Sequence, residues 1–523
     1  MSGQRYPPLV PGDLDVFPEP LPGRPLAPTA TPLRDLATWL ETLTPVRVQG
    51  DLGPAVTGIS LSTQRIRPGD LYAALPGARA HGADFAAAAL AAGAVGVLTD
   101  PAGAELLPPG TAALVVEQPR RVLGRVAAWI HGDPASAMQM IGVTGTQGKT
   151  TTTRLLEDGL EAAGITGAVI GTVGTRIAGT DIKTSLTTPE APDLHGLFAL
   201  MRERGVEVCA MEVSSHALVL GRVDGVVFDV ATFLNLGRDH LDFHTDVDDY
   251  FAAKASLFTP ERARRGLTNV DDEFGRRLLE HATIPMQTFS IDGPADWQAT
   301  DIVLAGDGAT FTVLGPDALR IPARVPVPGA FNVSNALAAI ASAALAGLDV
   351  ARVATGIGRG AGVPGRLEQV VAGQDFVLVV DYAHKPDAVE AVITTLRPLT
   401  DGRVIVVLGA GGDRDPGKRP IMGAIAAQLA DVLIVTDDNP RTEDPAAIRA
   451  AVLAGTGGPG SVGTAEVLEV GDRRAAIFEA VRRAAPGDVV LIAGKGHETG
   501  QEIDGEIHPF DDRTVAREAV AAR

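Results

Sequence analysis

One cysteine, Cys209, is present among 523 residues. A single thiol excludes an internal disulfide framework and fits a reducing compartment. Cys209 lies in the apolar run VEVCAMEV, which has no basic neighbour to favour a thiolate. We therefore interpret this residue as a buried structural thiol rather than a nucleophile.

Long apolar runs are also missing. No run reaches the roughly 20 apolar residues that a transmembrane helix needs. The N-terminal segment lacks a basic flank followed by an apolar core, so it does not have the pattern of a signal peptide. Its many prolines predict an extended, poorly ordered arm over residues 1–31. We expect a soluble, cytoplasmic protein without membrane insertion.

Positive charge is scarce, because 45 Lys and Arg residues against 64 Asp and Glu residues give a formal net charge of −19. A field of this sign repels nucleic acid, so we expect small-molecule partners instead. Aromatic residues make up only 4% of the chain, whereas glycine occurs 60 times. This composition favours α/β layers with short turns over an all-β sandwich.

The chain length predicts roughly three to four domains. Strand and helix patterns divide the chain, after the arm, into α/β blocks at 32–136, 137–362 and 363–523. In the last block, four apolar runs separated by helical stretches each lead into a polar turn. These runs are 376–384, 404–415, 431–441 and 488–498. We expect parallel strands whose carboxyl ends bring ligand-binding side chains to one edge of a sheet.

A glycine-rich turn, residues 145–150 (GTQGKT), follows the apolar run MQMIGV. It is a shortened phosphate loop, since Val143 stands where the strict pattern has glycine. We expect Lys149 to reach the outer phosphates and Thr150 to ligate Mg²⁺. A second segment, 356–361, formally fits a dinucleotide fingerprint but has no strand before it. We interpret it as a linker, so a dehydrogenase has little support.

Lys254 lies on the apolar stripe of a predicted helix, together with Tyr250, Phe251, Leu257 and Phe258. Burial of an ammonium group lowers its pKa. The alternative is that the long side chain extends to solvent.

Further motifs follow the phosphate loop in order and cover nearly all of the chain after the arm. They are TTPE (187–190), MEVSSHAL (211–218), NLGRDHLDFH (235–244), YFAAKASLF (250–258), GAFNVSNALAA (329–339), GVPGRLE (362–368), DYAHKPDA (381–388), GGDRDPGKRP (411–420), TDDNPR (436–441) and AGKGHE (493–498). This series resembles the Mur ligase family, in its MurE-type branch. The resemblance implies an α/β fold with three domains: a UDP-binding domain, a central P-loop ATPase domain with a parallel sheet, and a Rossmann-like C-terminal domain.

The resemblance also implies ATP as co-substrate and two Mg²⁺ ions. It assigns catalysis to Lys149, Glu212, His240 and Lys254. The implied metal ligands are Thr150, Glu212, His240 and Lys254, the last as a carbamate. The implied ATP-binding residues are Gly145, Thr146, Gln147, Gly148, Lys149, Thr150, Thr151, Asn269, Asp271, Asn332 and Arg366.

The substrate residues follow from the same resemblance. For a sugar nucleotide they are Thr63, Thr187, Thr188, Ser214 and Arg222. Thr63 stands in Ser-Thr-Gln where the family usually has Asp-Ser-Arg, so the uridine contacts stay undefined. Leu234 likewise stands where the family commonly has threonine.

The motif 438–441 resembles the one that recognises meso-diaminopimelate. The implied contacts are Arg419, Asp438, Asn439, Pro440, Arg441, Gly494 and Glu498. We expect Arg441 and Arg419 to bind the distal carboxylate, and Asp438 and Asn439 to accept hydrogen bonds from the distal ammonium.

The implied function is ATP-dependent ligation of meso-diaminopimelate to the D-Glu γ-carboxylate of UDP-MurNAc-L-Ala-D-Glu, through an acyl phosphate, in peptidoglycan precursor synthesis. Ligation of L-lysine to the same nucleotide, or of glutamate to folate, is the nearest alternative. A P-loop switch or motor is a second class, but it leaves the polar strand ends of the last block unexplained. The oligomeric state stays open, with a monomer expected.

Overall fold

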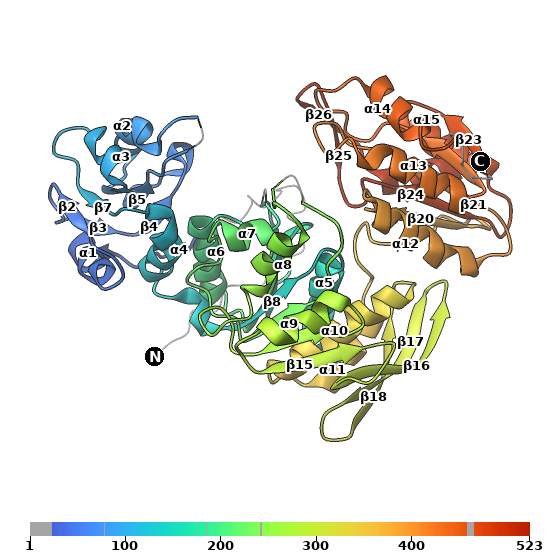
Figure 1. Ribbon diagram of the computed structural model, residues 1–523, viewed down its shortest axis with the longest axis horizontal. Coiled ribbons are helices and arrows are strands. Elements are labelled where there is room, and N and C mark those ends of the chain that lie inside the picture. The colour runs from blue at the N-terminus through green and yellow to red at the C-terminus, as the bar shows by residue number, and fades with distance from the viewer. Residues whose placement is uncertain (1–22, 78, 185, 241–242, 458–464) are drawn as a thin grey trace, which may run out of the picture.

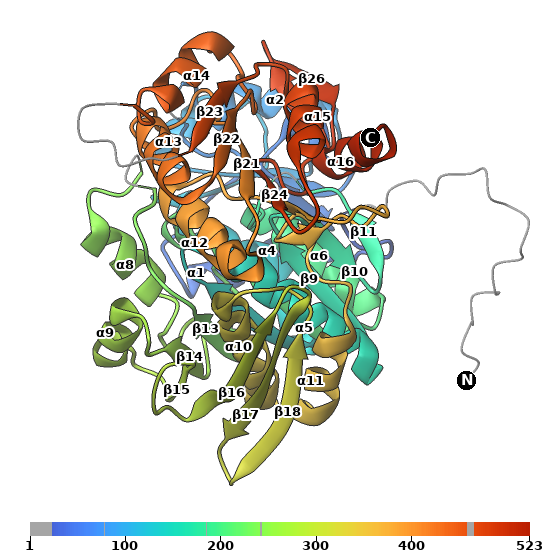
Figure 2. The same ribbon diagram turned by 90° about the vertical axis from the view of Figure 1, so that its right-hand side faces the viewer.

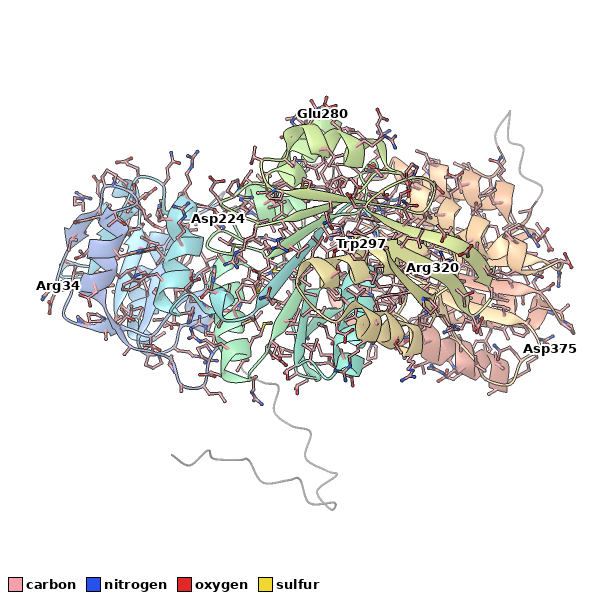
Figure 3. All side chains as sticks on the ribbon, turned by 90° about the horizontal axis from the view of Figure 1, so that it is seen from below. Arg34, Asp224, Glu280, Trp297, Arg320 and Asp375 are labelled. Carbon is pink, nitrogen blue, oxygen red and sulfur yellow. The ribbon has the colours of Figure 1, made fainter. Side chains whose placement is uncertain are left out.

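The computed structural model describes residues 23–77, 79–184, 186–240, 243–457 and 465–523. Its three lobes follow one another along the long axis of the molecule (Figure 1). Seen from below, Arg34 of the first lobe and Asp375 of the third lie toward opposite ends (Figure 3). None of the helices among the described residues has the length and apolar character that crossing a bilayer requires.

The first lobe is a five-stranded sheet with helices on both faces. Its strands lie in the order β2 (Arg47–Gln49), β7 (Ala113–Val115), β6 (Gly96–Thr99), β5 (Asp70–Ala73) and β4 (Gly58–Ser60). All neighbours are parallel except β2 and β7. One face packs against α1 (Leu33–Glu41) and α4 (Pro119–Ile130), and the other against α2 (Ala86–Ala91) and α3 (Pro101–Glu105).

The N-terminal arm is only partly within the described residues, since residues 1–22 lie outside them. Residues 23–32 are held in place, contrary to the expectation of a poorly ordered segment. The buried guanidinium of Arg24 donates to Asp70 Oδ2 at 2.6 Å and to the Ile59 carbonyl at 3.0 Å. The N–H groups of Leu26 and Ala27 donate to the carboxylate of Glu203 in the middle lobe. β1 (Thr31–Pro32) then pairs with β3 (Ala55–Val56), so this segment joins the first two lobes.

The middle lobe is built on an eleven-stranded sheet. The strand order is β11 (Thr180–Ile182), β10 (Gly174–Ile177), β9 (Gly167–Gly171), β12 (Val208–Glu212), β8 (Gln139–Thr144), β13 (Val230–Phe233), β14 (Gly266–Asn269), β15 (Met286–Ser290), β16 (Trp297–Ala305), β17 (Gly308–Gly315) and β18 (Leu319–Val325). Pairing is parallel from β9 to β16 and antiparallel at both ends. The central strands are apolar on both faces because helices cover both.

Helices α5 (Lys149–Ala163), α10 (Ala330–Leu345) and α11 (Val350–Arg359) cover one face of this sheet. The other face packs against α6 (Ala191–Glu203), α7 (Ser215–Val219), α8 (Val247–Ala255) and α9 (Glu273–His281). Cys209 is buried in this second core, where burial raises the pKa of its thiol to about 12. Its interpretation as a structural thiol agrees with this position.

The segment 356–361 is not simply a linker, because its first four residues form the last turn of α11. A Cβ on Gly356 would lie 2.9 Å from the Cα of Gly159 in α5. The glycine is therefore required for close approach of two helices and does not form a phosphate-binding turn.

The third lobe confirms the four predicted parallel strands. The order is β19 (Glu368–Gln369), β20 (Val377–Asp381), β24 (Val489–Ala493), β21 (Val404–Leu408), β22 (Val432–Val435) and β23 (Glu466–Glu469), with only β19 antiparallel. One face packs against α12 (Pro386–Leu396), α13 (Lys418–Leu429) and α14 (Pro445–Leu453), and the other against α15 (Arg473–Arg483) and α16 (Asp512–Ala521). Figure 2 shows the strands between these two helical layers. A hairpin, β25 (Gly500–Ile503) and β26 (Glu506–Pro509), follows the last parallel strand.

The Arg24–Asp70 pair predicts how the first lobe responds to substitution. Arg24→Met leaves Asp70 charged and buried, which we expect to destabilise this lobe by about 3–5 kcal/mol. Hydrogen exchange of the β5 amides measures the change, with exposed Arg34→Met as the matched control. The double variant Arg24→Met, Asp70→Asn should recover part of the loss, because no unpaired charge is left. Equal exchange in the Arg24 and Arg34 variants would contradict the expectation.

Candidate active site

A cavity of about 570 Å³ lies between the middle and third lobes. The phosphate loop forms one wall, between the end of β8 and the start of α5. Fourteen predicted site residues line the cavity: Thr146, Gln147, Gly148, Lys149, Thr150, Thr151, Thr187, Glu212, Ser214, His240, Asn269, Asp271, Asn332 and Arg366. The third lobe contributes Asp381, Tyr382, His384 and Lys385 to the same cavity.

Lys149 folds back onto its own loop. Its Nζ donates to the carbonyl oxygens of Gly145 at 2.7 Å and Thr146 at 3.1 Å. Burial lowers the pKa of Lys149 to about 8, although the nearby Glu212 carboxylate opposes the shift. Gly145 and Gly148 have φ angles of 153° and 85°, which a residue with a Cβ rarely adopts. The loop therefore depends on glycine at both positions.

Glu212 is a buried carboxylate at the end of β12, beside the loop. It accepts hydrogen bonds from the Thr150 hydroxyl at 2.9 Å, the Thr172 N–H at 2.8 Å and the Thr172 hydroxyl at 3.0 Å. Thr172 was not predicted as a site residue; the signal that could have indicated it is its place directly after a strand that ends in Gly171. Its two bonds orient the carboxylate.

His240 lines the cavity with its backbone in the left-handed region, at φ 54°. Burial lowers the pKa of its imidazole to about 4, so the ring is neutral at neutral pH and keeps a lone pair for a ligand. Its neighbour Asp239, also not predicted, forms an ion pair with Lys385 of the third lobe. Burial favours the neutral form of Asp239, but the charge of Lys385, joined by that of His240 once this ring is protonated below about pH 4, outweighs it and lowers the pKa of Asp239 to about 2.

Lys254 is buried, with 1% of its surface exposed, so the alternative of a side chain in solvent is wrong. Its Nζ donates to the Gly145 carbonyl at 3.0 Å and lies 4.6 Å from the centre of the Tyr250 ring. Burial, followed by the charge of Lys149, lowers the pKa of Lys254 well below its usual value. The apolar stripe predicted from the sequence is buried as expected.

The side chains near the loop can coordinate Mg²⁺ only together with oxygen atoms of a bound substrate. The Thr150 hydroxyl, the Glu212 carboxylate and the His240 ring line one cavity, and a bare Lys254 amine adds no oxygen. No cluster of three or more His, Cys, Asp or Glu able to hold a metal occurs within the described part of the chain. A small number of protein ligands is enough for Mg²⁺, because this ion usually keeps several water ligands and binds phosphate oxygens of the substrate.

The remaining predicted nucleotide residues lie on the cavity wall. The Asn269 side chain accepts the Asp271 N–H at 3.0 Å, and the Asp271 carboxylate accepts the Ile291 N–H at 2.8 Å. Asn332 donates to the Pro328 carbonyl at 2.7 Å and accepts from Asn335, which was not predicted. These bonds hold the two walls on which a nucleotide base and ribose could rest.

Arg366 links the two lobes. Its Nη2 donates to the Thr150 hydroxyl at 3.4 Å, and its guanidinium lies 4.4 Å from the centre of the Tyr382 ring. Burial, followed by the charge of the nearby Glu498 carboxylate, raises the pKa of Tyr382 to about 12. Glu498 accepts from Asn439 Nδ2 at 2.8 Å. Polar side chains therefore extend from the phosphate loop to the motif 438–441.

The predicted amino-acid residues gather beyond these side chains. Gly494 packs directly against the Asp438 carboxylate. Arg441, which follows Pro440, donates to Glu502 at 3.2 Å and to the Gly412 carbonyl at 2.6 Å. Arg419 is buried and paired with both oxygens of Glu443, at 2.8 and 2.9 Å. Both guanidinium groups thus reach the 411–412 turn.

Asn439 does not fit the role expected for it. Its Oδ1 accepts from Lys495 Nζ at 2.8 Å and from the Glu502 N–H at 3.0 Å, so both lone pairs are used. Its Nδ2 faces Glu498. Asn439 therefore orders the pocket, whereas Glu498 and Asp438 are left as acceptors for an ammonium group.

The predicted sugar-nucleotide residues are divided between two lobes. Thr187 contacts Thr172 at 3.0 Å, Thr188 donates to the Glu212 carbonyl at 2.9 Å, and Ser214 caps α7. Arg222 donates to Glu190 at 2.8 Å. Thr63 begins a short 3₁₀ helix in the first lobe, away from the cavity.

Comparison with known proteins identifies the three lobes. Residues 55–129 match the Mur ligase family catalytic domain, 143–343 the Mur ligase middle domain, and 365–496 the Mur ligase glutamate ligase domain. The chain belongs to the Mur ligase family. The three-domain α/β architecture of this family agrees with the fold described above.

Relatives in the family match nearly the whole chain. The UDP-N-acetylmuramoyl-L-alanyl-D-glutamate–2,6-diaminopimelate ligase of Streptomyces avermitilis is 55% identical over 504 residues, 96% of this chain and 98% of its own. The UDP-N-acetylmuramyl-tripeptide synthetase of Leifsonia xyli is 45% identical over 511 residues, 96% of this chain and 98% of its own. A solved UDP-N-acetylmuramoyl-L-alanyl-D-glutamate–2,6-diaminopimelate ligase is 32% identical with a TM-score of 0.67, covering 94% of this chain and 99% of its own.

The lowered pKa of Lys149 predicts an unusual reactivity profile. The side chain is protonated below pH 8 and neutral above it, whereas an exposed lysine stays protonated to about pH 10.4. In competitive acetylation between pH 6 and 11, we expect Lys149 to react half-maximally near pH 8, more than two pH units below the lysine of a short reference peptide. Identical profiles for Lys149 and the peptide lysine would show that burial does not control Lys149.

Proposed function

We propose that the chain is an ATP-dependent ligase that adds meso-diaminopimelate to the D-Glu γ-carboxylate of UDP-MurNAc-L-Ala-D-Glu in peptidoglycan precursor synthesis. One observation carries the proposal: the side chains of Arg366, Tyr382 and Glu498 extend from the phosphate loop of the middle lobe to the amino-acid motif of the third lobe. The names of the two full-length relatives and of the solved structure support the same reaction class.

The reaction must activate a carboxylate, which is a poor electrophile at neutral pH. Transfer of the γ-phosphoryl group of ATP to the D-Glu carboxylate forms an acyl phosphate and releases ADP. The amine of diaminopimelate then attacks the acyl carbon, phosphate leaves, and the amine loses a proton as the amide forms. Water exclusion by the joined lobes protects the acyl phosphate from hydrolysis.

Charge repulsion is the main barrier to this first step. Two unit negative charges 4 Å apart repel by about 1 kcal/mol in water and about 4 kcal/mol at an effective dielectric of 20. Lys149 and Arg366 line the cavity and offset this repulsion. Lys385, from the third lobe, adds a further ammonium group at the same wall.

For Mg²⁺ we propose two ions, held by Thr150, Glu212, His240 and a carbamylated Lys254. When bound, the ions supply positive charge that neutralises phosphate and carboxylate oxygens. The buried, neutral amine of Lys254 can attack carbon dioxide and lose a proton, which converts it into an anionic oxygen donor. The catalytic set is then Lys149, Glu212, His240 and Lys254.

For the other predicted residues we propose the substrate contacts that the family resemblance implies. ATP contacts come from Gly145–Thr151 and from Asn269, Asp271, Asn332 and Arg366. The sugar nucleotide contacts Thr63, Thr187, Thr188, Ser214 and Arg222. Meso-diaminopimelate contacts Arg419, Asp438, Pro440, Arg441, Gly494 and Glu498, with Asn439 as a supporting residue. We place the domains at 32–136, 137–362 and 363–523 and propose a cytoplasmic enzyme that works as a monomer, since one chain supplies every proposed ligand.

Amino-acid choice is the sharpest test of the proposal. Phosphate release is measured with ATP, Mg²⁺, UDP-MurNAc-L-Ala-D-Glu and either meso-diaminopimelate or L-lysine. Arg441 already pairs with Glu502, and only the distal carboxylate of meso-diaminopimelate, which lysine lacks, would give it a second anionic partner. One added charged hydrogen bond predicts discrimination of at least about tenfold. Arg441→Lys should lose most of it, because one ammonium cannot form two parallel hydrogen bonds.

The outcomes separate the two parts of this proposal. Phosphate release that neither amino acid stimulates would refute the ligase assignment. Equal rates with both amino acids would refute the choice of diaminopimelate and leave the ligase assignment standing.

Carbamylation of Lys254 has an independent spectroscopic test. Purified protein is incubated with ¹³C-bicarbonate, and a carbamate carbon resonance is sought by NMR. We expect one such resonance in the unsubstituted protein and none in Lys254→Met, while Lys183→Met serves as the control. A resonance that persists in Lys254→Met, or none in the unsubstituted protein, would contradict the modification.

A further inference from the structure

Lys495 is a fully buried lysine beside the proposed amino-acid pocket, with 0% of its surface exposed. It follows the end of β24 and stands between Gly494 and Gly496, whose φ angles are 117° and 53°. These left-handed glycines let the chain turn so that the ammonium group points inward. An ammonium group buried this deeply requires nearby partners, because desolvation is otherwise severe.

Two partners hold the Lys495 ammonium group. Its Nζ donates to Asn439 Oδ1 at 2.8 Å and to Glu498 Oε2 at 3.1 Å. The Asn439 Nδ2 group donates to the same Glu498 oxygen at 2.8 Å. The three side chains form a closed triangle, so the position of each depends on the other two.

The triangle sets the orientation of the acceptor that faces the pocket. Because Lys495 and the Glu502 N–H occupy Asn439 Oδ1, the amide must turn its Nδ2 toward Glu498. The Glu498 carboxylate is still 30% exposed and can meet a ligand. Lys495 itself is too deeply buried to do so.

Lys495 also sets the charge of the pocket. Asp438, Glu498 and Glu502 contribute three carboxylates, and the nearby cations are Arg441, Lys495 and Lys418, which interacts with the Asp438 charge. Neighbouring Arg419 and Arg473 are each neutralised by their own carboxylate partners. Without Lys495, three carboxylates would face two cations.

This balance matters for the choice of amino acid. The distal end of meso-diaminopimelate carries one ammonium and one carboxylate and is neutral overall. The distal end of lysine carries a single positive charge. A more negative pocket therefore binds lysine better and diaminopimelate worse.

We propose that Lys495 is a positioning residue for amino-acid specificity, which locks Asn439 and Glu498 and keeps the pocket suited to a zwitterionic distal group rather than to a monocation. The inference rests on the proposed ligase function. It concerns a side chain that touches no substrate and acts through its two partners.

The test compares kcat/KM for meso-diaminopimelate and L-lysine in Lys495→Met, Lys495→Gln and Lys495→Arg. Removal of one hydrogen-bonded charged partner should raise KM for diaminopimelate by at least about tenfold. The KM for ATP should stay within about twofold, because the phosphate cavity does not include Lys495. The ratio of the two kcat/KM values should fall in the Met and Gln variants and be retained better in the Arg variant.

Two matched variants separate charge from general damage. Lys495→Met combined with Glu498→Gln neutralises both members of the pair, and we expect it to recover part of the lost discrimination. Arg474→Met removes a positive charge from the exposed pair that Arg474 on α15 forms with Glu518 on α16, and it should leave the ratio unchanged. If the Met variant does not fold, the Gln and Arg variants carry the comparison.

Each result has a distinct meaning. An equal loss with both amino acids, or an unchanged ratio in the Met and Gln variants, would overturn the role of Lys495 while unsubstituted protein still ligates. An unsubstituted protein that no amino acid stimulates would overturn the proposed function itself and this inference with it.

Discussion

Two buried lysine side chains donate to one carbonyl oxygen, that of Gly145, at 2.7 Å from Lys149 Nζ and 3.0 Å from Lys254 Nζ. Burial lowers the pKa of both groups, and the charge of Lys149 lowers that of Lys254 further. The rest of the site follows from this constraint. Positive charge in a desolvated site is stable only near anions. The cavity walls supply the carboxylates of Glu212 and Asp239, and the cavity admits a bound phosphate.

The arrangement of the lobes converts this local feature into a site for two substrates. The middle lobe provides the loop, and the third lobe brings Arg366 and Lys385 to the same cavity. Tyr382 then connects Arg366 to Glu498, at the edge of the amino-acid pocket. The short segment after residue 22 fixes the first lobe to the middle one through Arg24 and Glu203. The junction between the first two lobes is therefore well anchored, and the reacting groups meet at the other junction.

Local patterns predicted much of this structure correctly. The strand–loop–helix unit around Lys149 and the four parallel strands of the third lobe follow from apolar periodicity and from glycine placement. The apolar stripe placed Lys254 on a buried helix face but left extension to solvent open, and the structure shows that the side chain is buried. By contrast, Gly356 was misinterpreted, because its role is helix–helix contact with Gly159, which no local pattern reports. Thr172 and Asp239 were missed because their partners, Glu212 and Lys385, lie far away in the sequence. Asn335 was also missed, although its partner Asn332 lies in the same helix.

The sequence by itself determined the chemical groups: a phosphate loop, a carboxylate after a strand, a lysine on an apolar stripe and an arginine after a proline turn. Only the tertiary structure decided which of them meet and which hydrogen-bonding capacity is left over. Arg366 reaches Thr150 across 216 positions, Lys385 pairs with Asp239 across 146, and Lys495 occupies Asn439 across 56. Such contacts depend on how whole sheets pack. Whether the Asn439 amide oxygen has a free lone pair depends on distances of a few tenths of an ångström. Local composition encodes neither.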